Sequence, residues 1–260
     1  MRPEISRAAL STALLALLSQ SALAQTDEIQ VYDAAIAEPG VFNLTWHNNF
    51  TLRGGKTAGT PGGVIPDHSL NGVPEWAYGV TDWLETGLYL PLYTITRDQA
   101  FQIDGAKLRL LFVSPHAAER PFFYGVNFEF SVNSRHWNPD RYTSEIRPIV
   151  GWHLGPLDVI VNPILDNAYQ GASQLQFVPA MRLAWNVSHV WALAAEEYSD
   201  FGPVGHLDAP ADQSHQLWAV IDHRGPAFAV EAGVGFGLTH AADARVVKLI
   251  IEHDLNAPAR

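Results

Sequence analysis

The sequence predicts an all-β protein, a closed antiparallel up-and-down transmembrane β-barrel of about twelve strands. Apolar and polar residues alternate along segments that are long enough to cross a bilayer as tilted strands. No segment after residue 24 has the roughly eighteen consecutive apolar residues of a membrane-spanning helix. Because only helices and closed barrels satisfy every backbone amide in lipid, strands that cross a membrane must close into a barrel.

The first residues have the three-part layout of a secretory signal peptide, which we expect to span residues 1–24. Arg2 and Arg7 precede an apolar stretch from Ala8 to Leu18, and the small-residue tripeptide Ala22-Leu23-Ala24 follows it. The apolar stretch is about half as long as the roughly twenty residues that a membrane-crossing helix needs. We therefore predict an exported chain from which this segment is cleaved.

The rest of the chain is expected to form one domain. Residues 25–40 are expected to be a periplasmic N-terminal segment, residues 41–255 the barrel, and residues 256–260 a C-terminal tail. The formal net charge of −11 argues against nucleic acid as a partner, because phosphate-binding surfaces need a basic patch. The chain has no cysteine, so its core or its strand pairing must hold it together without disulfides.

Two segments show the strand pattern most clearly. From Val41 to Arg53 apolar and polar residues alternate, and the pattern repeats from Pro121 to Asn133. A period of two means a strand with one apolar and one polar face, which fits a wall between lipid and a polar interior. The same pattern places strands near residues 41–53, 73–81, 84–96, 104–114, 121–133, 141–154, 157–166, 174–186, 189–200, 213–223, 227–239 and 245–254.

The connections between these strands alternate in length. Every second connection is short and has turn-forming residues, as in Thr81-Asp82, Gly155-Pro156 and Arg224-Gly225-Pro226. The intervening links are longer, and the longest, from Gly54 to Gly72, is rich in Gly and Pro. This layout is typical of a bacterial outer-membrane barrel with short periplasmic turns and longer external loops.

Four tryptophans lie within a few residues of the predicted short turns: Trp83, Trp152, Trp185 and Trp191. An amphipathic indole is favoured at the boundary between acyl chains and headgroups, so we expect these side chains at the periplasmic membrane interface. The alternative is a soluble β-sandwich in which the same tryptophans fill the core. A sandwich gives no reason for connections to alternate in length, so the barrel is the preferred interpretation.

Charged residues on the polar strand faces are expected to line the lumen, because a base that faces acyl chains at mid-depth costs roughly 2–4 kcal/mol. These residues are Glu75, Glu85, Lys107, Arg109, Glu129, Glu145, Arg147, Asp158, Arg182, Glu196 and Glu231. Their excess of carboxylates favours cations or neutral polar solutes if the lumen is open. The alternative is a lattice of acid–base pairs that fills the lumen, and a barrel of about twelve strands is compatible with both.

No residue is predicted to be catalytic, to bind a cofactor or to ligate a metal. The eleven histidines include no HExxH motif and no pair spaced by four residues. Ser214-His215 and Ser188-His189 place a hydroxyl beside an imidazole, but neighbours along a strand point to opposite faces. A hydrolase near the external rim would need a Ser and a His from adjacent strands, and this is the enzymatic alternative.

Five segments carry a family resemblance, including the runs NGVPEWAYGVTDW and FFYGVNFE. They resemble a widespread group of uncharacterised proteobacterial outer-membrane barrels at residues 71–83, 122–129, 144–152, 161–165 and 235–240. That group is similar, more distantly, to outer-membrane proteins associated with phenol degradation pathways of the meta type. The resemblance implies passive transport of small organic or aromatic compounds and assigns no functional residues.

We therefore expect a passive outer-membrane channel or facilitator for small solutes, and not an enzyme. Its expected partners are outer-membrane lipid, lipopolysaccharide and a small-molecule solute, and no cofactor is expected. Besides the hydrolase, one further alternative is a plugged barrel whose loop from Gly54 to Gly72 meets a partner at the cell surface.

Overall fold

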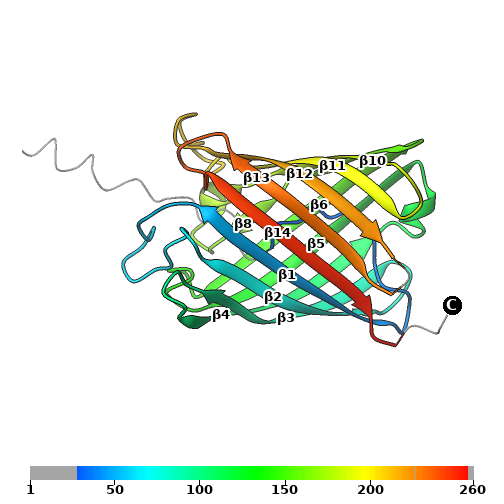
Figure 1. Cartoon of the computed structure of the whole chain (residues 1–260), viewed down its shortest axis with the longest axis horizontal. Helices are drawn as coiled ribbons and strands as arrows, with labels where there is room; N and C mark the ends of the chain where they lie inside the picture. Colours follow the sequence, from blue (N-terminus) through cyan, green and yellow to red (C-terminus); the bar gives the residue numbers. More distant parts are fainter. Residues whose placement is uncertain (1–27, 226, 257–260) are drawn as a thin grey trace, which may run out of the picture.

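A computed structural model describes residues 28–225 and 227–256, which form a closed barrel of antiparallel strands (Figure 1). The predicted signal peptide and residues 257–260 of the predicted tail lie outside the described residues. The strands are β1 (Phe42–Arg53), β2 (Leu70–Gly79), β3 (Leu84–Ile95), β4 (Phe101–Val113), β5 (Phe122–Asn133), β6 (Tyr142–Leu154), β7 (Leu157–Asn162), β8 (Leu165–Asn167), β9 (Gln176–Phe177), β10 (Ala180–Asn186), β11 (Trp191–Asp200), β12 (Ser214–Arg224), β13 (Ala229–Gly237) and β14 (Arg245–Asp254). β1 pairs with both β2 and β14, which closes the barrel.

The fourteen strands form twelve staves of the barrel wall, each of which spans it from end to end, and this confirms the predicted fold. β7 and β8 form one stave, which is interrupted at Pro163, and β9 and β10 form another, which is interrupted at Pro179. Proline has no amide hydrogen to donate, so it breaks the ladder at both places. The amide of Val178 donates to the carbonyl of Ile164 at 3.1 Å, and this hydrogen bond joins the two interrupted staves next to their prolines.

The strand alternation produces an apolar outer face and a mixed inner face. Along β1 the inward-facing Asn43, Thr45 and His47 are buried, whereas Trp46 between them is 45% exposed on the outside. The inner face also carries apolar side chains, which gather mainly on β4 to β7 as Leu111, Val113, Phe123, Ile149 and Ile160. We call these five residues the apolar strip.

The two ends of the barrel differ in their connections. The short-turn end, on the right in Figure 1, has links such as the one between β6 and β7, and the other end carries longer loops such as residues 54–69. Two short 3-10 turns, η1 (Ala117–Glu119) and η2 (Ala172–Gln174), lie in connections. None of the helices in the described residues is long and apolar enough to cross a membrane.

Residues 28–38, which we call the plug segment, run inside the barrel from the middle of the lumen to the short-turn end. They are part of residues 25–40, which were expected to be a periplasmic segment, and they lie within the barrel. Ile29, Val31, Tyr32 and Ala34 are each at most 5% exposed, because they pack against inward-facing apolar side chains. Burial of apolar surface accounts for its position.

Candidate functional site

The first charged group in the lumen surrounds Arg109 on β4. Its guanidinium lies 2.7 Å from a carboxylate oxygen of Glu75 and also pairs with Glu85. His47 Nε2 lies 3.2 Å from the other oxygen of Glu75. All four side chains are buried, so removing the base would leave Glu85 without a cation and Glu75 with only the imidazole of His47.

The second group surrounds Arg182 on β10 and Lys248 on β14. Arg182 pairs with Glu196, Asp222 and Glu231, and its distance to Glu231 is 3.1 Å. Lys248 Nζ lies 2.5 Å from Glu196 and 2.6 Å from Glu231. Two cations therefore share three carboxylates across five strands, β10 to β14.

The remaining predicted lumen residues lie on β4 to β7. Lys107 is 3.3 Å from Glu129, and Arg147 Nε is 2.6 Å from Glu145. Asp158 lies 2.7 Å from both His153 Nδ1 and Asn186 Nδ2, near the short-turn end. The structure thus places all eleven predicted residues on the inner face and joins them to partners.

The plug segment is bound most closely through Tyr32. Its amide donates to Asn162 Oδ1 at 2.7 Å, and Asn162 Nδ2 donates back to its carbonyl at 3.0 Å. The Tyr32 hydroxyl lies 2.6 Å from the hydroxyl of Tyr89, and the guanidinium of Arg147 lies 4.4 Å from the centre of its ring. Burial raises the pKa of Tyr32 well above its ordinary value, and the nearby Glu28 adds to this rise.

Two cations on the wall bind carbonyl groups of the plug segment. Arg147 Nη1 donates to the carbonyl of Gln30 at 3.0 Å, and Lys248 Nζ donates to the carbonyl of Ile29 at 3.1 Å. These are charge-assisted hydrogen bonds, which are stronger than hydrogen bonds between neutral groups. They hold the segment between β6 and β14, on different sides of the lumen.

The segment leaves the barrel beside the end of β2. The amide of Ala37 donates to Glu85 Oε2 at 2.5 Å. A Cβ atom at Gly79 would lie 2.4 Å from the carbonyl oxygen of Ala37 and 2.3 Å from that of Glu38. Gly79 is therefore needed at this close approach of two backbones.

Glu28 has an unusual environment at the inner end of the plug segment. The residue is 1% exposed, and neither carboxyl oxygen has a hydrogen-bond partner among the described residues. The closest cation, Arg147, lies 3.9 Å away. Burial, followed by repulsion from Glu129, raises the pKa of Glu28 from 4.5 to about 7.

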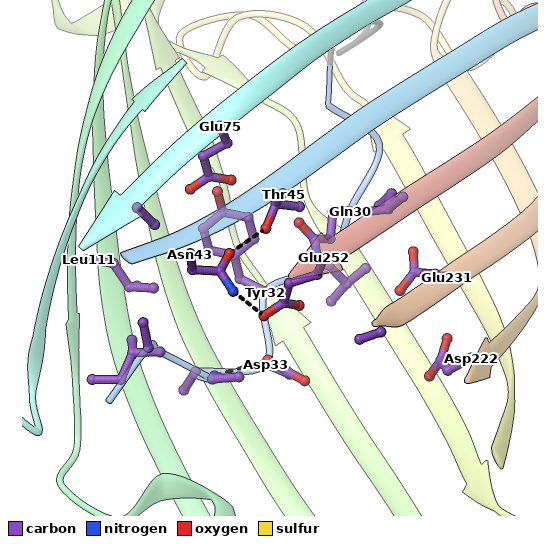
Figure 2. Close-up of a pocket in the computed structure, with 18 of the residues that line it drawn as sticks. Gln30, Tyr32, Asp33, Asn43, Thr45, Glu75, Leu111, Asp222, Glu231 and Glu252 are labelled. Carbon is purple, nitrogen blue, oxygen red and sulfur yellow. Dashed lines mark hydrogen bonds between the residues drawn. The ribbon is translucent and has the colours of Figure 1, made fainter. Parts of the chain in front are cut away.

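A cavity of about 340 Å³ lies between the plug segment and the wall (Figure 2). Its lining includes six carboxylates and three guanidinium groups, so it is acidic. Glu252 is solvent-exposed within it and accepts a hydrogen bond from Asn43 Nδ2 at 3.0 Å. The cavity has the size of a small ligand site and the charge to admit cations rather than anions.

Inward-facing glycines do not leave the lumen open. The ring of Phe123 lies where a Cβ atom of Gly151 would stand, and the indole of Trp218 lies against Gly235 in the same way. The space that these glycines provide is filled by aromatic rings from neighbouring strands. Together with the plug segment, these rings narrow the path through the barrel.

The four predicted interface tryptophans lie on the outer face near the short-turn end. Trp83, Trp152, Trp185 and Trp191 are between 37 and 52% exposed. Trp152 packs against Phe122, and Trp191 packs against His223, with ring centres 5.6 and 4.5 Å apart. Their positions form an aromatic band around this end.

The side chains of Ser214 and His215 point to opposite faces of β12, as strand geometry requires. His215 contacts a different serine, Ser199, on the neighbouring strand. Ser199 Oγ lies 2.7 Å from His215 Nδ1, while Gln213 Oε1 lies 3.2 Å from Nε2. This cluster lies on the outer face of β11 and β12, away from the lumen. The carboxylate of Glu197 also contacts Ser199 Oγ and competes with the imidazole for its single hydrogen, and Ser199 is only 8% exposed. A hydrolase is not favoured.

Three parts of the site were missed by sequence reasoning: the plug segment, Asn162 and Lys248. In β14 Lys248 lies between Val246 and Ile250 on the inner face, so that face is not uniformly polar and Lys248 is not among the predicted lumen residues. Asn162 lies inside the predicted strand 157–166 but is uncharged, and only charged residues are assigned to the lumen. The available signal was the apolar content of residues 28–38, which does not suit a solvated periplasmic segment.

Comparison with known proteins shows similarity in fold alone. No protein-family model matches the sequence, and no curated protein matches it. The crystal structure of the COG4313 outer membrane channel from Pseudomonas putida F1 is similar with a TM-score of 0.58 and 13% identity, over 88% of this chain and 100% of that chain. The KdgM porin in complex with disordered oligogalacturonate is similar with a TM-score of 0.52 and 7% identity, over 82% of this chain and 99% of that chain.

Proposed function

We propose that the protein is an outer-membrane channel for passive diffusion of small solutes, which its own plug segment holds closed. The observation that carries the proposal is the position of residues 28–38, which occupy the lumen but belong to no strand of the wall. A structural filler would be expected to form part of the wall or its loops. A separate segment that enters from one end can leave without breaking the barrel.

The lining of the lumen supports small organic solutes. The apolar strip lies on one side, and the group around Arg182 and Lys248 lies on another. Withdrawal of the plug segment would expose both surfaces. Such a path suits a solute with an apolar body and a polar or cationic group, including aromatic compounds of the kind that the family resemblance implies.

The outer face supports placement in the outer membrane. The aromatic band at the short-turn end would lie at the periplasmic boundary, in contact with lipid headgroups. The longer loops would then lie outside the cell, where lipopolysaccharide surrounds the barrel. Export would depend on the signal peptide predicted at residues 1–24.

Planar-bilayer recording tests the channel directly. The full mature chain is compared with a variant in which a Gly/Ser sequence of equal length replaces residues 28–38. We expect rare openings for the full chain and stable conductance steps for the variant. A control variant carries the same replacement at residues 56–66 of the external loop and should behave as the full chain does. If the plug variant never conducts over a range of voltages, passive transport is refuted, and if the full chain conducts equally well, the plug role is refuted.

Cysteine labelling tests the movement of the plug segment without electrical recording. The chain has no cysteine, so a single introduced thiol reports on one position. Ala34→Cys places the thiol at a position that is 4% exposed, and Ala35→Cys places it at an exposed neighbouring position. We expect slow labelling at position 34 and fast labelling at position 35, with fast labelling at both if the segment does not occupy the lumen.

A further inference from the structure

The hydrogen bonds between the wall and the plug segment go mainly to main-chain atoms of the segment. Asn162 binds both the amide and the carbonyl of Tyr32. Arg147 and Lys248 bind the carbonyls of the two residues at positions 30 and 29, and Glu85 binds the amide of Ala37. Five hydrogen bonds thus reach the main chain from side chains on β3, β6, β7 and β14.

The two hydrogen bonds between Asn162 and Tyr32 imitate the pairing of two β-strands. A carboxamide that accepts from an amide and donates to the carbonyl of the same residue reproduces the exchange of hydrogen bonds in an antiparallel ladder. Asn162 is fully buried, so its two polar atoms need partners whenever the lumen is filled by something other than water. Its side chain is therefore suited to the main chain of an extended peptide.

Specific side-chain contacts to the plug segment are few. Tyr32 fills an aromatic subsite beside Tyr89, Arg109 and Arg147. Val31 and Ala34 pack against the apolar strip, which selects apolar character but no defined polar group. Glu28 has no hydrogen-bond partner among the described residues, and Asp33 binds only an amide of its own segment, that of Ala35.

We infer that the lumen contains a binding site for short extended peptides from outside the chain, with an aromatic side chain at the Tyr32 position and apolar side chains around it. The inference rests on the proposed function, because the plug segment must leave before another peptide enters. Main-chain groups are the same in every peptide, so the site recognises a foreign sequence of this pattern nearly as well as its own segment. The plug segment occupies the site in the way that such a peptide would.

Synthetic peptides added to the Gly/Ser plug variant test the inference. The first probe is the peptide of residues 28–38, and the second is an unrelated peptide of equal length that alternates Val and Thr and has Tyr at the fifth position. Binding of fluorescently labelled peptides to the purified variant is measured by anisotropy, and block of conductance is measured in bilayers. We expect the two dissociation constants to agree within about tenfold.

N-methylated peptides provide the matched control without any change in the protein. Methylation of the Tyr amide removes the hydrogen that Asn162 accepts, whereas methylation of the following Asp amide removes a hydrogen that has no acceptor among the described residues. We expect the first change to weaken binding at least about tenfold and the second to weaken it much less. Asn162→Ala should remove the difference between the two peptides.

The outcomes separate this inference from the proposed function. If only the peptide of residues 28–38 binds, the site is specific for the plug and the inference is overturned. Equal weakening by both N-methyl groups also overturns it, because main-chain recognition at Asn162 is then absent. If the unrelated peptide binds while the variant never conducts, the peptide site stands and the channel is refuted.

Discussion

Arg147 Nη1 lies 3.9 Å from Glu28 Oε1, which is too long for a hydrogen bond, although both side chains are only 1% exposed. The guanidinium is already engaged by Glu145 and by the carbonyl of Gln30. Glu28 is therefore a buried carboxyl group whose charge is poorly compensated. The charged and neutral forms of this group must favour different positions of the plug segment.

Closure of the plug is expected to depend on pH through Glu28. Its pKa is raised from 4.5 to about 7 in the closed position by burial and by Glu129, and we take it to return to its ordinary value when the segment is in solvent. A raised pKa means that the closed state binds the proton more tightly, so closure is favoured at low pH and weakens as pH rises from about 4.5 to 7. The difference corresponds to about 3 kcal/mol. We expect the open fraction in bilayers to increase over this range.

Glu28→Gln should remove this pH dependence and keep the channel closed at neutral pH. The groups that face Glu28 are Glu129, Arg147, His47 and Lys107, and all of them remain in this variant. Asp33→Asn changes an exposed carboxylate of the same segment and should leave the pH dependence as it is. An equal response of the two variants would show that other lumen groups control closure.

Asn162→Ala is expected to loosen the plug segment. The substitution leaves the amide and the carbonyl of Tyr32 buried without partners, at about 1–3 kcal/mol for each group. The labelling rate at Ala34→Cys should rise by about tenfold or more. Asn71→Ala provides the control, because Asn71 is also a buried, inward-facing asparagine but binds Thr94 on the wall. Equal rates in the two variants would argue against a role for Asn162 in closure.

The barrel could be predicted from the sequence because lipid outside and polar groups inside impose a period of two on nearly every strand. The predicted strand 245–254 coincides with β14, and the prediction at 157–166 fails only where Pro163 divides β7 from β8. The inward charges follow from the same rule. The ion-pair partners of these charges cannot be predicted in this way, because pairs such as Arg182 with Asp222 depend on how far neighbouring strands are staggered.

The plug segment could not be placed from the sequence for a different reason. Its position depends on contacts with residues more than a hundred positions away, such as Asn162 and Lys248. Residues 28–38 form no strand and contain no charged pattern that marks a lumen. The apolar strip could not be predicted either, because a single apolar residue on the polar face of a strand looks like an exception to the alternation and does not indicate a binding surface.

Arg182→Met should destabilise the barrel itself. The change leaves Glu196 and Glu231 with Lys248, and it leaves the buried Asp222 with only the half-exposed Arg224, 3.7 Å away. Breaking a buried ion pair costs about 3–5 kcal/mol. Unfolding can be followed by the temperature at which the band of the folded barrel shifts on a denaturing gel. Arg224→Met removes a base whose side chain is 47% exposed, and it should change that temperature little. Equal shifts would mean that the buried network does not stabilise the wall.

Glu252 is expected to favour cations in the open channel. It is exposed in the cavity, its partner Asn43 is neutral, and no basic partner is found for it within residues 28–225 and 227–256. When it is ionised, its charge therefore has no basic partner, unlike that of Glu231, which pairs with Arg182 and Lys248. Because an uncompensated carboxylate beside a narrow path attracts cations and repels anions, Glu252→Gln in the Gly/Ser plug variant should lower the cation preference.

The reversal potential under a potassium chloride gradient measures that preference. Glu197→Gln is the matched control, because it removes a carboxylate from the outer face of β11 and leaves the lumen unchanged. We expect the reversal potential to move toward zero for Glu252→Gln and to stay unchanged for Glu197→Gln. An anion-selective channel before any substitution would contradict the charge balance of the cavity, since six carboxylates there face three guanidinium groups. Ion flow would then follow a route that avoids the cavity.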